Sequence, residues 1–360
     1  MTTGVFCYIF WPDYCIFEKK QLLLHYITQN SLIMFKVIIS DSVYNRIISE
    51  EKGKAEPAQS YLFKLLNQLP QERVRVLKKE ETERLKNGPD KVLKNPTSLY
   101  ILDISKAEAQ SIQENYGVMC LSGESPDISP LIDINDEHTT EEMKPLDRGW
   151  DSVLDTVEFL PSNSLILTDR YLFNTTNAYY GNGFDNVRNI LTELLPRKLN
   201  TTYFITVIFD RDSIDELYNF NSIAKRLNEL KENLKKELKL EYPIVMEVLG
   251  IKEKTDIYRA LHNRRIVSNY YVVKMDYKLA AFHKTIGTVD QTIIPQVLFT
   301  EDSLNKRSSA PLKSLEQITK ALRKFSQMLP SPNTNHSAYS YAVDGQKMEK
   351  CIAIRNLLIK

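Results

Sequence analysis

The stretch LHNRRIVSNYYVV, residues 261–273, decides how the second half of the chain folds and which chemistry it could carry. It holds a histidine, His262, an arginine two positions later, Arg264, and a small polar residue, Asn269. β-Branched and aromatic residues surround these side chains, which is typical of a buried strand. The stretch therefore predicts a strand with candidate functional residues near its start.

Strands and helices are predicted to alternate around this stretch. Apolar runs rich in β-branched residues indicate strands, and apolar residues at three- and four-residue spacing indicate helices. The predicted elements are a strand over 164–173, a helix over 184–195, a strand over 202–210, a helix over 221–240, strands over 243–250 and 264–275 (the second with a turn at Ser268–Asn269), and a helix over 312–329.

This order of elements, with the motif that follows it, resembles the phospholipase D superfamily. That superfamily carries H-x-K-x4-D on the loop and strand after such a unit, and His262, Arg264 and Asn269 here give H-x-R-x4-N. The variant is similar to the phospholipase D-like module at the C-terminus of MIT-domain proteins and their bacterial relatives. The resemblance covers about residues 160–310 and implies a phospholipase D-like α/β domain.

The resemblance also implies a reaction that needs no cofactor. In the superfamily a neutral histidine attacks phosphorus, a second histidine protonates the leaving oxygen, and lysines hold the non-bridging oxygens. His262, Arg264 and Asn269 are then the catalytic candidates. Of the five histidines, His262 alone stands in H-x-[KR], so one motif implies a homodimer or no catalysis.

The two departures from the superfamily motif have different consequences. Arg264 keeps its charge and binds phosphate through two parallel hydrogen bonds, so phosphate recognition survives. Asn269 can hydrogen-bond an imidazole but cannot stabilise the imidazolium that forms during transfer. The structural alternative is that His262 caps or packs beside the strand while the arginines are solvated.

The same region is locally basic and aromatic. Residues 252–284 hold eight Lys or Arg against three acids, and Arg265, Lys274 and Lys278 are the candidate phosphate-binding or nucleic-acid-binding residues. Tyrosines alternate with these lysines, as in proteins that stack bases on aromatic rings. A strand whose residues alternate between core and solvent is the alternative explanation. The tyrosines are Tyr270, Tyr271 and Tyr277.

The first half predicts a small parallel α/β domain, with strands over 35–41, 98–105 and 118–124. Asp41, Asp103 and Glu124 lie at or just beyond strand ends, where parallel strands form a crevice. Acids gathered there could bind Mg²⁺ or Mn²⁺, and their placement loosely resembles PIN-domain ribonucleases. The structural alternative is helix N-capping, which suits Asp103 before a helix that starts at 106.

The composition describes a globular protein of 360 residues with a formal net charge of +1, so overall charge does not drive nucleic-acid binding. The predicted class is α/β, with a small parallel α/β N-terminal domain followed by a phospholipase D-like α/β domain. The predicted divisions are an extension over 1–33, with Met34 as an alternative start, the small domain over 34–125, an acidic linker over 126–160, the phospholipase D-like domain over 161–329, and a flexible tail over 330–360 with a terminal apolar segment.

Several classes of site are disfavoured by the sequence. Four cysteines without C-x-x-C spacing argue against a zinc site or disulfide framework and fit a reducing cytoplasm. Neither a signal peptide nor a transmembrane helix is expected. The glycine-rich motifs of nucleotide-binding loops do not occur.

Three functional hypotheses follow. The first is a cytoplasmic phosphodiester-engaging protein, with nucleic acid as the expected phosphodiester, that uses His262 and Arg264; by resemblance it is a bacterial nuclease or host-defence protein. The second is a non-catalytic module that binds a phosphate or a protein partner and forms a homodimer, with a partner subunit left open. The third is a metal-dependent nuclease centred on Asp41 and Asp103.

Overall fold

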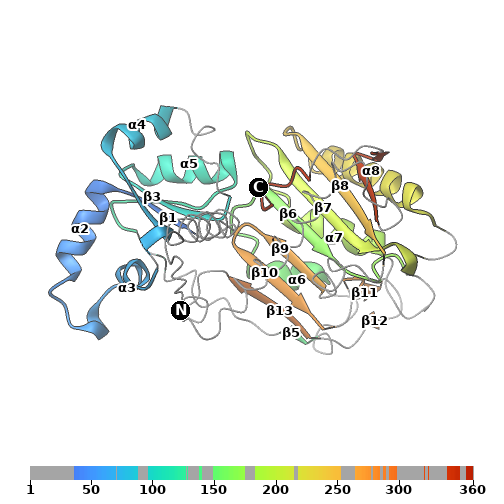
Figure 1. Ribbon diagram of the computed structural model, residues 1–360, viewed down its shortest axis with the longest axis horizontal. Coiled ribbons are helices and arrows are strands. Elements are labelled where there is room, and N and C mark those ends of the chain that lie inside the picture. The colour runs from blue at the N-terminus through green and yellow to red at the C-terminus, as the bar shows by residue number, and fades with distance from the viewer. Residues whose placement is uncertain are drawn as a thin grey trace, which may run out of the picture.

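A computed structural model gives the fold of the chain, with a small and a large β-sheet side by side (Figure 1). The residues that the structure describes are 36–69, 71–87, 96–126, 128, 138–139, 149–174, 183–214, 218–252, 264–276, 279–283, 287–288, 292–297, 320, 323, 339–348 and 354–359. The α/β class predicted from the sequence is confirmed. Residues 1–33 and nearly all of the predicted helix over 312–329 lie outside the described residues.

The small sheet consists of parallel strands in the order β2-β1-β3-β4. Its strands are β1 (Lys36–Ser40), β2 (Val74–Leu77), β3 (Ser98–Leu102) and β4 (Cys120–Ser122). Its helices are α2 (Asp41–Glu51), α3 (Tyr61–Gln68), α4 (Lys79–Asn87) and α5 (Lys106–Tyr116), with 3-10 turns η1 (Glu56–Ala58) and η2 (Gln71–Arg73).

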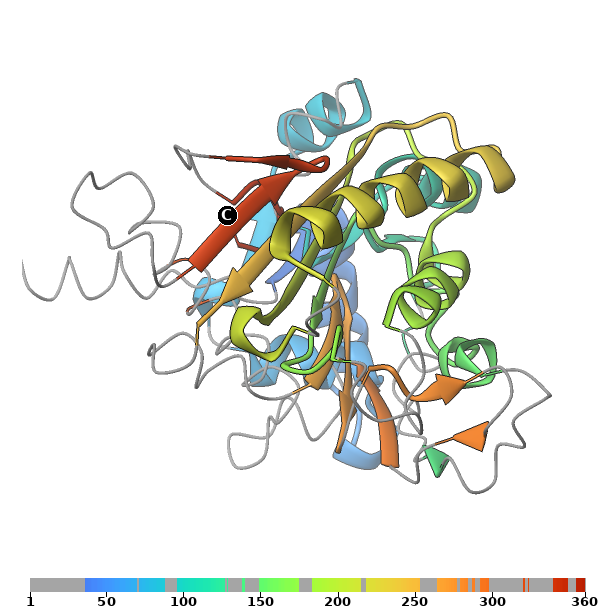
Figure 2. The same cartoon turned by 90° about the vertical axis from the view of Figure 1, so that its right-hand side faces the viewer.

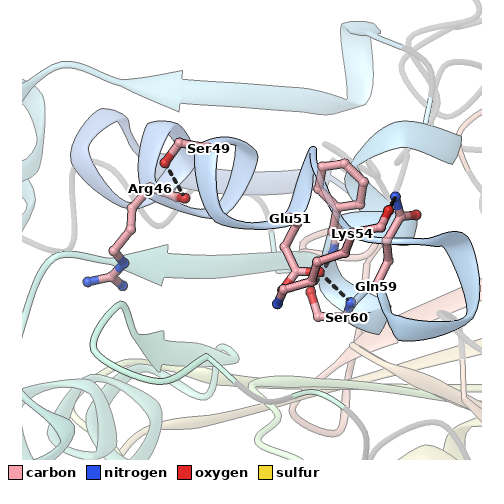
Figure 3. Close-up of polar contacts among 7 residues, drawn as sticks. Arg46, Ser49, Glu51, Lys54, Gln59 and Ser60 are labelled. Atoms are coloured by element: carbon pink, nitrogen blue, oxygen red, sulfur yellow. Dashed lines mark hydrogen bonds and ion pairs between the residues drawn. The ribbon is translucent and has the colours of Figure 1, made fainter.

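Local sequence signals explain where these helices begin and end. Ser105 and Glu108 form a capping box at the start of α5, and Gly117 ends the helix in the left-handed conformation, as its position predicts. Figure 3 shows how Glu51, at the end of α2, fixes the start of α3. Its carboxylate accepts hydrogen bonds from Lys54 Nζ (2.5 Å) and from the backbone N–H of Ser60 (2.8 Å). These contacts, with Lys54 first, lower the pKa of Glu51.

The large sheet has the order β15-β14-β8-β7-β6-β9-β10-β13-β5, with β6, β7 and β8 parallel to one another. Its strands are β5 (His138–Thr139), β6 (Ser164–Thr168), β7 (Tyr203–Asp210), β8 (Ile244–Ile251), β9 (Arg264–Ser268), β10 (Tyr271–Met275), β13 (Thr292–Val297), β14 (Tyr339–Val343) and β15 (Gln346–Lys347). The helices are α6 (Trp150–Leu154), α7 (Gly183–Leu194) and α8 (Phe220–Glu237); η5 (Arg211–Ser213) and a separate pair, β11 (Phe282–His283) and β12 (Gly287–Thr288), complete this half.

The predicted strand–helix alternation of this half is confirmed from β6 to β9, including the turn after Ser268 that separates β9 from β10. Helices α6, α7 and α8 lie on the same side of the large sheet (Figure 2). On that side the Phe220 ring of α8 stacks on Phe209, with ring centroids 6.2 Å apart, and covers Gly250. Within the described residues, no helix is long and apolar enough to cross a membrane.

The predicted acidic linker differs from the structure because two of its parts belong to the large half. β5 pairs with β13 at the sheet edge, and Trp150 of α6 is buried. The Trp150 indole donates a hydrogen bond to Asn186 Oδ1 (2.8 Å) and meets the Phe282 ring edge-on at 5.3 Å. Burial of so large a side chain outweighs the acidic character of the surrounding sequence.

The predicted flexible tail also differs, since residues 339–347 form a hairpin that extends the large sheet beside β8. Asp344 and Gly345 connect its strands, with φ values of 47° and 78°. An Asp-Gly pair between two short strands is a strong hairpin signal that the sequence analysis missed. Lys231 of α8 holds the turn through an ion pair with Asp344 (2.7 Å).

Buried hydrogen bonds join the two sheets. The Tyr270 hydroxyl accepts from the N–H of Met119 (2.7 Å) and donates to the carbonyl of Ser98 (2.8 Å). Gly117 lies so close to the other half that a Cβ added to it would be 2.2 Å from the Ser162 carbonyl oxygen. At Gly117 the two halves therefore meet without space for a side chain.

Gly117→Ala tests this junction. We expect it to lower the free energy of unfolding by about 3 kcal/mol, because alanine would take a left-handed conformation and would also overlap main-chain atoms. Urea denaturation measures the change. Gly53→Ala is the matched control, with no atom within 4 Å of its added Cβ, and a change equal to that of Gly117→Ala would contradict the junction.

Candidate functional site

The candidate site lies on the face of the large sheet opposite α8. Successive strand residues point to opposite faces, so Glu247 faces away from the helices that cover Gly250. The strand registers place Thr206, Arg265 and Lys274 on the same face as Glu247. We call this the polar face, defined by Thr206, Glu247, Arg265 and Lys274.

Arg265 and Lys274 lie directly opposite each other on the antiparallel strands β9 and β10. Such facing residues have Cβ atoms about 5 Å apart. Arg265 is 7% exposed, and burial lowers its pKa. Burial lowers the pKa of Lys274 as well, with a further contribution from Arg265. Two partly desolvated cations thus face each other at a position that the sequence singled out.

The first predicted catalytic residue lies outside this description. His262 precedes β9 by two residues, and neither it nor Lys278 belongs to the described residues. Arg264 opens β9 and donates a hydrogen bond to the carbonyl of Asp276 (3.3 Å). Because neighbouring strand residues point to opposite faces, Arg264 lies on the helix-covered side and Arg265 on the polar face.

Asn269 takes a structural position at the junction of the two sheets. Its Nδ2 donates to the carbonyls of Pro96 (2.8 Å) and Gly117 (3.2 Å) and to Asn163 Oδ1 (3.0 Å). Its Oδ1 accepts from the N–H groups of Asn163 and Ser164. The four steps of β9 from Arg264 to Ser268 span about 13 Å at roughly 3.3 Å per residue, and Asn269 follows Ser268. The structure therefore does not bring Asn269 to the start of β9.

Tyr270 and Tyr271 are buried, with exposed fractions of 0% and 1%. Burial raises the pKa of Tyr270 well above its usual range. Neither ring presents a face to solvent for stacking against a base. Of the two explanations for the tyrosine pattern, the structure favours core packing for this pair.

Glu247 is a functional candidate that the sequence analysis missed. It is fully buried and accepts hydrogen bonds from the Tyr341 hydroxyl, Thr206 Oγ1 (3.1 Å), and the N–H groups of Arg355 (2.7 Å) and Asn356 (3.1 Å). Burial raises its pKa, while these hydrogen bonds oppose the rise. A glutamate inside the apolar run PIVMEVLG (243–250) was the available signal.

Two of the acids of the small domain accept hydrogen bonds from neighbouring side chains. Asp103 accepts a hydrogen bond from the Ser42 hydroxyl (2.8 Å), and Asp41 accepts one from Asn45 Nδ2 (2.9 Å). No group of three His, Cys, Asp or Glu side chains that could hold a metal ion occurs in the part of the chain that the structure describes, which includes Glu124. The N-cap of α5 is Ser105 rather than Asp103.

The aspartates at the ends of β6 and β7 hold neighbouring loops through hydrogen bonds. Asp169 accepts from the N–H groups of Tyr171 (2.9 Å) and Leu279 (2.7 Å). Asp210 accepts from the Ser213 hydroxyl (2.7 Å) and lies 3.3 Å from Arg170 Nε. The chain's own donors therefore occupy these two carboxylates.

Comparisons with known proteins do not assign a family. No protein-family model matches the sequence, and no curated protein matches it significantly. Among solved structures, the crystal structure of Drosophila Piwi is similar over 81% of this chain, with 12% identity and a TM-score of 0.18. This chain spans 44% of that Piwi chain. Such a TM-score is too low to indicate a shared fold.

Asn269→Asp separates the structural role from a catalytic one. The carboxylate would lose three donated hydrogen bonds and face carbonyl oxygens in a buried site, so we expect a loss of about 3 kcal/mol in the free energy of unfolding. Chemical denaturation measures the loss. Asn219→Asp is the control, because its side chain caps α8 by accepting a hydrogen bond and Asp can do the same. Unchanged stability with a gain of phosphodiester cleavage would contradict the structural role.

Lys274→Met tests whether the two facing cations oppose each other. We expect the free energy of unfolding to rise by about 0.5 kcal/mol, because facing like charges destabilise a strand pair. Urea denaturation of the protein without added ligand gives the value. Lys236→Met, on the exposed side of α8, should change it little. A loss of stability on Lys274→Met would instead indicate that an acidic group pairs with Lys274.

Proposed function

We propose that this protein binds phosphodiesters, with nucleic acid as the expected one, through Arg265 and Lys274 of the polar face. The observation that supports this most is that two partly buried cations face each other on adjacent strands. An anion held between them would contact both cations. A phosphate suits the pair, because guanidinium binds it through two parallel hydrogen bonds and ammonium binds it as a point charge.

The geometry favours binding of the phosphodiester without its hydrolysis. Hydrolysis of the phospholipase D kind needs a residue that orients the attacking imidazole. Asn269, the candidate for that role, makes its hydrogen bonds at the junction of the two sheets instead. Cleavage by His262 would also require a second histidine from another subunit. A cytoplasmic homodimer of phospholipase D-like type is therefore required for the hydrolytic version of the proposal and is not required for binding alone.

The binding proposal is tested with fluorescein-labelled single-stranded and double-stranded oligonucleotides, followed by fluorescence anisotropy over a range of KCl concentrations. Lys274→Met and Arg265→Met should each weaken binding about tenfold and reduce its salt dependence. The matched control is Arg188→Ala, which removes an exposed cation of α7 paired with Glu237 (2.6 Å). Equal affinity in all of these variants would refute the proposal.

A cleavage assay separates the three hypotheses. The same oligonucleotides are incubated with the protein with and without EDTA, and products are resolved on a denaturing gel. Cleavage that survives EDTA and disappears in His262→Ala would indicate the histidine mechanism. Cleavage lost with EDTA and in Asp103→Asn would indicate the metal-dependent alternative. Binding without cleavage is the expected result.

A further inference from the structure

A cleft with a volume of about 870 Å³ separates α5 and β4 of the small half from two segments of the large half. Clefts of this size at the junction of two structural units are common places for small ligands. Its opposite wall comes from residues 158–162, after α6, and 192–198, at the end of α7. The cleft is distinct from the polar face, since the lining includes none of Thr206, Glu247, Arg265 and Lys274.

Hydrogen bonds and close packing join the two halves next to the cleft. Asn163 Nδ2 donates to the carbonyl of Tyr116 (2.9 Å), and the N–H of Asn200 donates to the carbonyl of Asn115 (2.7 Å). Gly117 approaches Ser162 without room for a Cβ. The cleft is thus preformed, so a ligand would not need to order its walls.

Phe159 gives the cleft an aromatic surface. It is 55% exposed and is one of two large hydrophobic side chains that are exposed within the described residues. A half-exposed aromatic ring beside polar groups offers a face on which a planar ring can stack. Stacking would remove both apolar surfaces from water.

Charged side chains flank this ring. Arg197 and Lys198 lie consecutively on the loop that follows α7, and Glu158 and Glu193 lie on the same wall as Phe159. Burial raises the pKa of Glu193, followed by repulsion from nearby acids, while Arg197 opposes the rise. The wall therefore offers cations for an anionic group and carboxyl groups for the amino groups of a polar ring.

The cleft is suited to binding rather than to covalent chemistry. Its one described cysteine, Cys120, is 1% exposed, and burial raises the pKa of its thiol to about 12. A thiol with such a pKa remains protonated and is a poor nucleophile. The described lining residues give no other activated nucleophile.

We propose that this cleft binds a nucleoside monophosphate, with the base stacked on Phe159 and the phosphate held by Arg197 and Lys198. Each part of the ligand suits a different part of the lining. A purely apolar ligand would leave the charged groups without partners, and a free phosphate would leave Phe159 exposed. Side chains would hold the phosphate, which agrees with the absence of a glycine-rich loop in the sequence.

Isothermal titration calorimetry with AMP, adenosine and inorganic phosphate tests the site in the full chain. AMP should bind, and adenosine or inorganic phosphate alone should bind at least tenfold more weakly. Phe159→Ala should weaken AMP binding about tenfold, the usual effect of losing one base–aromatic contact. The double variant Arg197→Ala/Lys198→Ala should bring AMP affinity down to that of adenosine.

Thermal unfolding without ligand shows whether the variants remain folded, since Phe159 is more than half exposed and its loss should leave Tm nearly unchanged. Arg188→Ala, on α7 and outside the cleft, is the control for a general change of charge. No AMP binding at millimolar concentration would overturn the proposal. Binding that is equal in wild type, Phe159→Ala and the double variant would overturn it as well.

Discussion

The side chains of Asn269 and Tyr270, at the turn between β9 and β10, hold the two halves of the structure together. Both are fully buried. Asn269 donates to main-chain carbonyls of the small half, and the Tyr270 hydroxyl both accepts from and donates to main-chain groups there. A buried polar group without a hydrogen-bond partner costs more free energy than a satisfied one contributes. These hydrogen bonds therefore favour this arrangement of the two halves. That arrangement fixes the position of the turn between β9 and β10 against the small half.

The polar face of the large sheet carries two different arrangements of charge: a hydrogen-bonded carboxylate and a pair of facing cations. Four donors surround the Glu247 carboxylate, and this network ties β8 to the C-terminal residues. Arg265 and Lys274 instead place like charges opposite each other on neighbouring strands, an arrangement that costs stability unless other groups offset it.

Local sequence signals predicted most of the regular elements. β-Branched runs placed β1, β3, β6, β7 and β8, and Gly117 placed the end of α5. Contacts between distant residues decide the parts that were predicted wrongly: Trp150 brings α6 into the large half, and β14 pairs with β8 although strands β9 to β13 lie between them in the sequence. The same limit applies to Asn269, since no local pattern distinguishes a residue that orients a histidine from one that joins two sheets.

The placement of residues 354–359 has a consequence for how the protein is made. Asn356 Nδ2 donates to the carbonyl of Leu165 (3.0 Å), across a separation of 191 residues, and Leu358 is fully buried. While a ribosome is still translating the chain, β6, β7 and β8 have already emerged with Glu247 and neighbouring apolar side chains uncovered. Such long-range closure slows folding and exposes the nascent chain to aggregation. Chaperone capture during synthesis would protect this sheet until its last partner arrives.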